Sequence, residues 1–77
     1  MPPRAEPQPA LGKAIEELRK KKGLTQEAVA HAADVHPTWM SRLEGGALNP
    51  SWGMIERVAG ALGVTLSELA KAAERLK

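Results

Sequence analysis

The sequence predicts an all-α domain built from five short helices. Apolar residues recur at helical spacing, i, i+3 or i+4 and i+7, along most of the chain from residue 11 to residue 76. Residues that start helices precede the later apolar runs, and glycines follow the first, third and fourth runs. The chain has 77 residues and no cysteine, so it holds one domain at most and no disulfide.

The first helix is expected from residue 10 to Gly23, a natural stop for a helix. Its apolar residues are Leu11, Ile15 and Leu18. The basic residues 19–22 fall at its end, where they suit the negative end of the helix dipole. The second helix should begin after Thr25, a good N-cap, with Glu27 in its first turn. The apolar side predicted for it consists of Ala28, Val29 and Ala32.

The third helix is expected from Pro37 to Glu44. Proline is favoured at the first helical position and pushes the residue before it toward the extended backbone of an N-cap, here His36. Gly45 and Gly46 should end the helix. Because only residues 33–35 are left to separate the second helix from the third, the two together predict a helix-turn-helix.

The fourth and fifth helices are expected on either side of Gly63. Ser51 should cap the fourth, and Thr65 with Glu68 three residues later forms the capping box of the fifth. The apolar stripe of the fourth helix is Trp52, Ile55, Val58, Ala59 and Leu62. That of the fifth is Leu66, Leu69, Ala73 and Leu76.

Residues 1–9 hold four of the six prolines, which predicts an extended, mobile tail ahead of a domain at 10–77. The functional alternative for this tail is that Arg4 reaches a DNA minor groove. No stretch resembles a signal peptide or a membrane span, so a cytoplasmic protein without a membrane partner is expected.

The sequence offers little for catalysis or for a cofactor. The net charge of +2 gives only weak support for a polyanionic partner. His31 and His36 are five residues apart, off the i, i+4 spacing of a helical metal pair. There is no nucleophile–base pair and no glycine-rich phosphate loop. We therefore expect neither an enzyme, nor a metal site, nor a cofactor.

The stretch LTQEAVAHAADVHPTWMSRLEGGALNPS, followed by IERVAGALGVTLSEL, resembles the lambda-repressor-like helix-turn-helix family of the xenobiotic-response-element type. The resemblance covers about residues 11–76. Four signals carry it jointly, in order and at matching spacing: residues 24–27, 41–44, 49–51 and 61–64. It implies a five-helix fold whose third helix enters the major groove of DNA.

The third helix has one apolar and one polar side at about 100° per residue. Met40 and Leu43 point to the apolar side. The predicted base-contacting residues are Pro37, Thr38, Ser41 and Arg42. Arg42 can donate two hydrogen bonds to guanine O6 and N7, whereas Pro37 offers only apolar contact. The alternative is a solvated polar face, and the resemblance favours the DNA interpretation.

Phosphate contacts are expected from Gln26, Trp39, Lys22 and Gly45. The resemblance implies that Gln26 bonds a phosphate and braces the third helix. Trp39 could donate its indole N–H or simply cover the core edge, and Lys22 could be a solvated helix end. The loop from residue 45 to residue 49 has no Lys or Arg, so Gly45 would have to act through its backbone N–H.

The resemblance also implies a salt bridge between Arg19 and Glu44 that orients the third helix. The chain departs from the family pattern at Asp34, which stands where many relatives have a turn glycine, although Asp tolerates left-handed backbone. His36 replaces the usual serine or threonine cap.

The function expected is sequence-specific binding of double-stranded DNA by a small transcriptional regulator, with repression as the favoured mode. A homodimer would read a pseudo-palindromic operator with half-sites about 34 Å apart. The candidate dimer surface is Leu69, Ala73 and Leu76 of the fifth helix, or else the rim of the fourth helix. The alternative for the early leucines, Leu66 and Leu69, is that they close the core of the monomer. The alternative function is a protein-interaction module, an adaptor or an antitoxin that grips a toxin.

Overall fold

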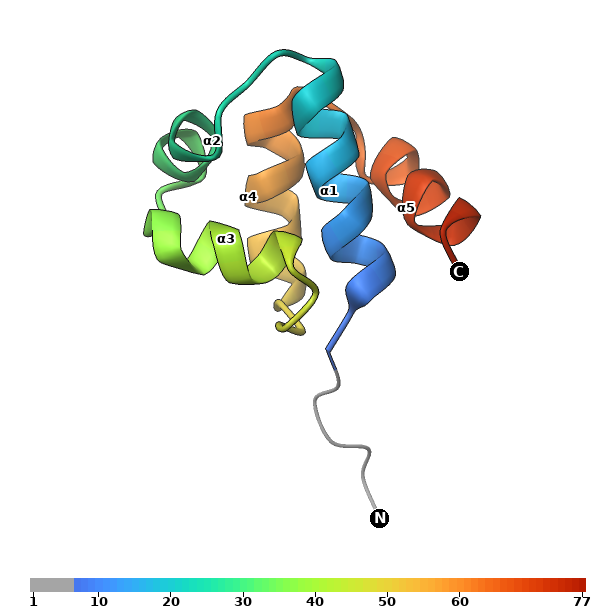
Figure 1. The fold of residues 1–77 in the computed structure, drawn as a ribbon. Helices are drawn as coiled ribbons and strands as arrows, with labels where there is room; N and C mark the ends of the chain where they lie inside the picture. The colour runs from blue at the N-terminus through green and yellow to red at the C-terminus, as the bar shows by residue number, and fades with distance from the viewer. Residues whose placement is uncertain (1–6) are drawn as a thin grey trace.

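The computed structural model describes residues 7–77, which form five helices and no strand. The helices are α1 (Pro9–Lys21), α2 (Gln26–Ala33), α3 (Pro37–Glu44), α4 (Trp52–Leu62) and α5 (Leu66–Arg75). Figure 1 shows α1 in the middle of the domain, with α2 and α3 on one side and α5 on the other. The all-α prediction is confirmed. No helix within these residues is long and apolar enough to cross a bilayer.

The predicted N-caps hold the starts of four helices. The Thr25 and Ser51 hydroxyls accept hydrogen bonds from backbone N–H groups in the first turns of α2 and α4, at 3.0 and 3.2 Å. His36 caps α3 through Nδ1, which accepts the N–H of Thr38 at 3.0 Å. Gly63 ends α4 at φ +72°, a left-handed conformation that glycine adopts without strain. These ends were predictable because each depends on residues close together in the chain.

The first helix begins at Pro9, one residue before the predicted domain boundary. Gln8 belongs to the domain as well, because its backbone N–H donates to Leu48 O at 3.0 Å. A β-carbon on Gly46 would stand 2.7 Å from the Pro9 α-carbon, so the chain passes tightly over the end of α3 here. Residues 1–6, including Arg4, lie outside the described residues, so the tail prediction stays untested there.

The turn between α2 and α3 comprises residues 34–36, one residue later than predicted, because Ala33 is still helical. Asp34 occupies the left-handed region at φ +58°, the backbone conformation expected at a position where many relatives have a turn glycine. Arg57 of α4 secures this turn: its Nη2 donates to Asp34 O at 2.8 Å and lies 3.4 Å from Asp34 Oδ2. No sequence pattern pointed to this contact across the fold.

The buried side of α2 differs from the predicted one. Val29, Ala30 and Ala33 are buried, whereas Ala28 and Ala32 are exposed. Four of the eight residues of α2 are alanines, so side-chain size does not mark one stripe as more apolar than the next. Packing of α2 against α3 and α4 selects the stripe.

Trp52 is 64% exposed, so the prediction that it joins the core is wrong. It is the first residue of α4, and Ile55, three residues on, is only partly buried. The first turn of α4 therefore extends past the edge of the core, which takes in Val58 and Leu62 instead.

The capping box of α5 should make stability depend on pH. Glu68 accepts the Thr65 N–H at 3.1 Å, and this bond, with a further contribution from the Thr65 hydroxyl, lowers the pKa of Glu68 below its ordinary 4.5. A lowered folded-state pKa adds stability above the unfolded value, and that stability is lost as pH falls through the folded value. We expect Glu68→Gln to flatten the decline in melting temperature between about pH 6 and about pH 3. If the melting temperatures of the unchanged protein and of Glu68→Gln declined in parallel as pH falls, this prediction would be contradicted.

Candidate nucleic-acid interface

The outward side of α3 carries the predicted base-contacting residues. Met40 and Leu43 are 0% and 1% exposed and anchor α3 in the core. The exposed residues of the helix are Pro37, Thr38, Ser41 and Arg42. Among residues 7–77 no ion-pair partner approaches the Arg42 guanidinium. The structure thus presents two hydroxyls and one unpaired cation on α3, a helix at the surface of the domain (Figure 1).

A buried carboxylate locks the end of α3 to α1. Glu44 receives two hydrogen bonds from the Arg19 guanidinium, Nε to Oε2 at 2.6 Å and Nη2 to Oε1 at 3.0 Å. Its side chain is 2% exposed, and that of Arg19 is 12% exposed. The third donor atom of Arg19, Nη1, bonds Leu24 O at 2.8 Å. This is the pair that the resemblance implied, and its hydrogen bonds raise the pKa of Arg19 above the usual range.

Gln26 also bonds the same carboxylate. Its Nε2 donates to Glu44 Oε1 at 2.8 Å, from the first residue of α2 to the last residue of α3. Glu44 therefore ties three helices together. No local pattern signalled this bond, because the two residues are 18 positions apart and either could have faced solvent.

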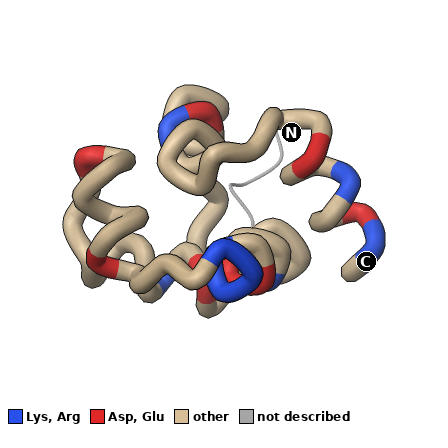
Figure 2. Tube along the Cα trace, turned by 90° about the horizontal axis from the view of Figure 1, so that it is seen from above, with Lys and Arg blue, Asp and Glu red and all other residues tan. Residues whose placement is uncertain are grey.

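The other expected phosphate contacts are placed less favourably. Trp39 is partly buried against the core, which leaves both of its predicted roles open. The Lys22 ammonium lies 3.9 Å from where a β-carbon on Gly63 would stand, beside the turn between α4 and α5. Three further basic residues, 19–21, lie in the last turn of α1, and Figure 2 shows Lys and Arg gathered at this end of the helix. The structure does not bring Lys22 to the outward side of α3.

The backbone N–H of Gly45 is already used. It donates to Ser41 O at 3.0 Å, and the N–H groups of Gly46 and Ala47 donate to Leu43 O and Arg42 O. The last turn of α3 consumes these donors because its carbonyl groups otherwise lack partners. The reason given for a phosphate contact at Gly45, a free backbone donor, therefore fails.

The predicted dimer surface is partly wrong. Leu69 is 1% exposed and closes the core between α1 and α5, which is the alternative that the sequence left open. Ala73 is partly buried, and Leu76 is 39% exposed. Leu69 was wrongly assigned to the dimer surface because it lies on the same predicted apolar stripe as Ala73 and Leu76. Only packing showed that α5 turns Leu69 and Ala72 toward the core.

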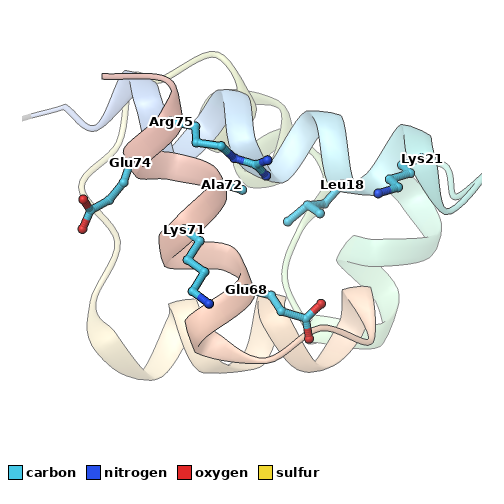
Figure 3. Close-up of a pocket in the computed structure, with 7 residues that line it drawn as sticks. All are labelled: Leu18, Lys21, Glu68, Lys71, Ala72, Glu74 and Arg75. Carbon is cyan, nitrogen blue, oxygen red and sulfur yellow. The ribbon is translucent and has the colours of Figure 1, made fainter.

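Beside α5 runs an open groove of about 580 Å³ (Figure 3). Leu18 of α1 and Ala72 of α5 line it with apolar atoms. Charges of both signs surround them: Lys21, Glu68, Lys71, Glu74 and Arg75. The mixed rim gives this side of the molecule no single-sign field of the kind that attracts nucleic acid.

Comparisons with known proteins agree with this geometry. A family model described as a helix-turn-helix domain matches residues 10–72. Control protein C.MunI from Mycoplasma sp is 40% identical over 60 residues, covering 77% of this chain and 81% of that protein. The immunity repressor protein of Bacillus phage phi105 is 36% identical over 59 residues, covering 77% of this chain but only 41% of the repressor.

A similar structure has also been solved. The clp gene regulator ClgR from C. glutamicum superposes with a TM-score of 0.85 at 32% identity, covering 88% of both chains. With its five helices and its α2–turn–α3 unit, the chain belongs to the helix-turn-helix domain family, in the lambda-repressor-like branch that the sequence resembles.

Proposed function

We propose that this protein is a transcriptional regulator that binds double-stranded DNA in a sequence-specific manner, with α3 in the major groove. The observation that carries the proposal is the outward side of α3, where Arg42 has no ion-pair partner among residues 7–77, while the buried Met40 and Leu43 anchor the helix from its other side. An unpaired guanidinium on a rigid helix suits the O6 and N7 acceptors of guanine. In this proposal the protein acts by binding DNA rather than by catalysis, and it does so in the cytoplasm.

A homodimer on a pseudo-palindromic operator is part of this proposal. An α3 of eight residues offers few base contacts, and a second copy doubles them at a spacing of about 34 Å. The names of the relatives, a control protein and an immunity repressor, agree with regulation, and repression is the favoured mode. Ala73 of α5 and Leu76, the residue directly after α5, remain the proposed contact, now without Leu69.

In this proposal the contacts to DNA phosphates come from residues at the edges of the outward side of α3. Gln26 stands at the first residue of α2, where the first backbone N–H groups lack helical partners and favour anions. Trp39 lies on α3 itself and is only partly buried. The N–H groups of residues 45–47 take no part, because α3 uses them.

A second candidate function is a protein-interaction module, such as an antitoxin that grips a toxin. Two observations favour this candidate. The backbone N–H groups of residues 45–47 are already hydrogen-bonded, and residues 45–49 include no Lys or Arg. Both features weaken binding to DNA phosphates.

Selection of duplexes from a random DNA pool at moderate salt separates the two functions. We expect a motif with two-fold symmetry and a guanine in each half-site. Arg42→Ala should bind the selected duplex about 5- to 150-fold more weakly and lose the guanine preference. Lys13→Ala, which also removes one positive charge but lies on α1, should change binding by less than about twofold.

Each other outcome has a definite meaning. No enrichment would overturn the DNA-binding proposal and leave the protein-interaction module. An enriched motif that Arg42→Ala reads equally well would overturn the role of Arg42 in base reading. A motif without symmetry would overturn the dimer.

A further inference from the structure

The side-chain amide of Gln26 has one orientation imposed on it by its neighbour. Glu44 is a carboxylate, which only accepts hydrogen bonds, and it lies 2.8 Å from Gln26 Nε2. The carbonyl oxygen of Gln26 cannot take that place, because two acceptors would then face each other. One N–H of Nε2 therefore points to Glu44, and the second N–H is left for another acceptor.

Glu44 itself cannot turn away from Gln26. Two hydrogen bonds from Arg19 hold both of its oxygens, and its side chain is 2% exposed. Arg19 is in turn held by Leu24 O, two residues before α2 begins. The carboxylate is thus a fixed point for a glutamine side chain that would otherwise sample many rotamers.

We propose that Glu44 is a positioning residue for DNA binding, which orients the Gln26 amide so that its second N–H is offered to a phosphate. This inference rests on the proposed function. The free protein holds Gln26 ready, so binding does not have to order that side chain. The bond between Gln26 and Glu44 also couples the phosphate contact at α2 to the end of α3, the helix that reads bases.

A double-mutant cycle on the selected duplex tests this role. Gln26→Met keeps the length of the side chain and removes its donor, and we expect it to weaken binding about tenfold. Glu44→Gln replaces one of the two oxygens by an NH₂ group, so the Gln26 amide must compete with the Arg19 guanidinium for the single oxygen left. In this background Gln26→Met should weaken binding by less than about twofold. Glu74→Gln on α5 gives the same change in charge, and in that background the tenfold effect should persist.

Arg42→Ala separates positioning from a general loosening of α3. If Glu44 only held α3 in place, Glu44→Gln would also shrink the effect of Arg42→Ala. We expect instead the same loss from Arg42→Ala in the unchanged protein and in the Glu44→Gln background. Circular dichroism melting confirms that each variant is folded at the temperature used. Should Glu44→Gln be unfolded there, Glu44→Asp keeps the charge but withdraws the carboxylate from Gln26, with the same expected result.

The outcomes are distinguishable. Failure of the unchanged protein to bind any duplex overturns the proposed function and this inference with it. If the protein binds but Gln26→Met reduces the affinity for the duplex equally in every background, only the inference is overturned. A Glu44→Gln background that reduces the effects of Gln26→Met and Arg42→Ala alike also overturns only the inference.

Discussion

Glu44→Ala is expected to lower the free energy of unfolding by about 3 kcal/mol, the lower end of the range for breaking a buried ion pair. The variant leaves the Arg19 side chain, which is 12% exposed, without its counter-ion. The lower end applies because Arg19 lies at the edge of the core and can turn part of its side chain to water. For a domain of this size the melting temperature should fall by about 12–24 °C. Urea and thermal unfolding followed by circular dichroism measure both quantities.

The same variant should weaken binding to the selected duplex, because the end of α3 loses its attachment to α1. Glu74→Ala provides the control: it removes an exposed carboxylate from α5, and its effect on stability should stay within about 0.5 kcal/mol. An unchanged melting temperature together with an unchanged DNA affinity for Glu44→Ala would show that the pair does not fix α3.

Gly12→Ala should destabilise the domain by about 3 kcal/mol, the upper end of the cost of overpacking. A β-carbon on Gly12 would stand 2.2 Å from Leu43 O and 3.0 Å from both Glu44 O and Gly46 N. All three atoms are backbone, so no side chain can rotate away and α1 must move off the end of α3. The gain of about 1 kcal/mol in helix propensity is too small to offset this.

Gly60→Ala is the matched control for this prediction. Gly60 also lies inside a helix, but nothing stands within 4 Å of a β-carbon built on it. Its replacement should therefore stabilise the domain by about 0.5–1 kcal/mol. Denaturation midpoints of the two variants should move in opposite directions. A stabilising Gly12→Ala would mean that α1 and α3 lie farther apart than the structure places them.

The starts and ends of the helices could be predicted from the sequence because each is a local event. His36 and Pro37 specify the start of α3 together, and Thr65 with Glu68 specifies that of α5. Such contacts join residues two or three positions apart, so the chain itself brings them together. The exposure of Thr38, Ser41 and Arg42 could be predicted for the same reason, since the helix period fixes which side chains lie opposite Met40 and Leu43.

The tertiary structure decided the features that depend on distant residues. Gly12 and Gly60 are equivalent in the sequence, as helical glycines, and only the approach of α1 to α3 makes one of them indispensable. Leu69 and Leu76 share the apolar stripe predicted for the fifth helix, yet packing against α1 covers the first and leaves the second exposed.

By itself, the sequence determined an all-α helix-turn-helix domain and the exposed polar side of its third helix, because helix caps and helix periodicity act within a few residues. The bond from Gln26 to Glu44 spans 18 residues and the bond from Arg57 to Asp34 spans 23. Whether such pairs form depends on how the helices pack, which no local pattern specifies. Tertiary packing therefore decided which side chains hold the third helix in place.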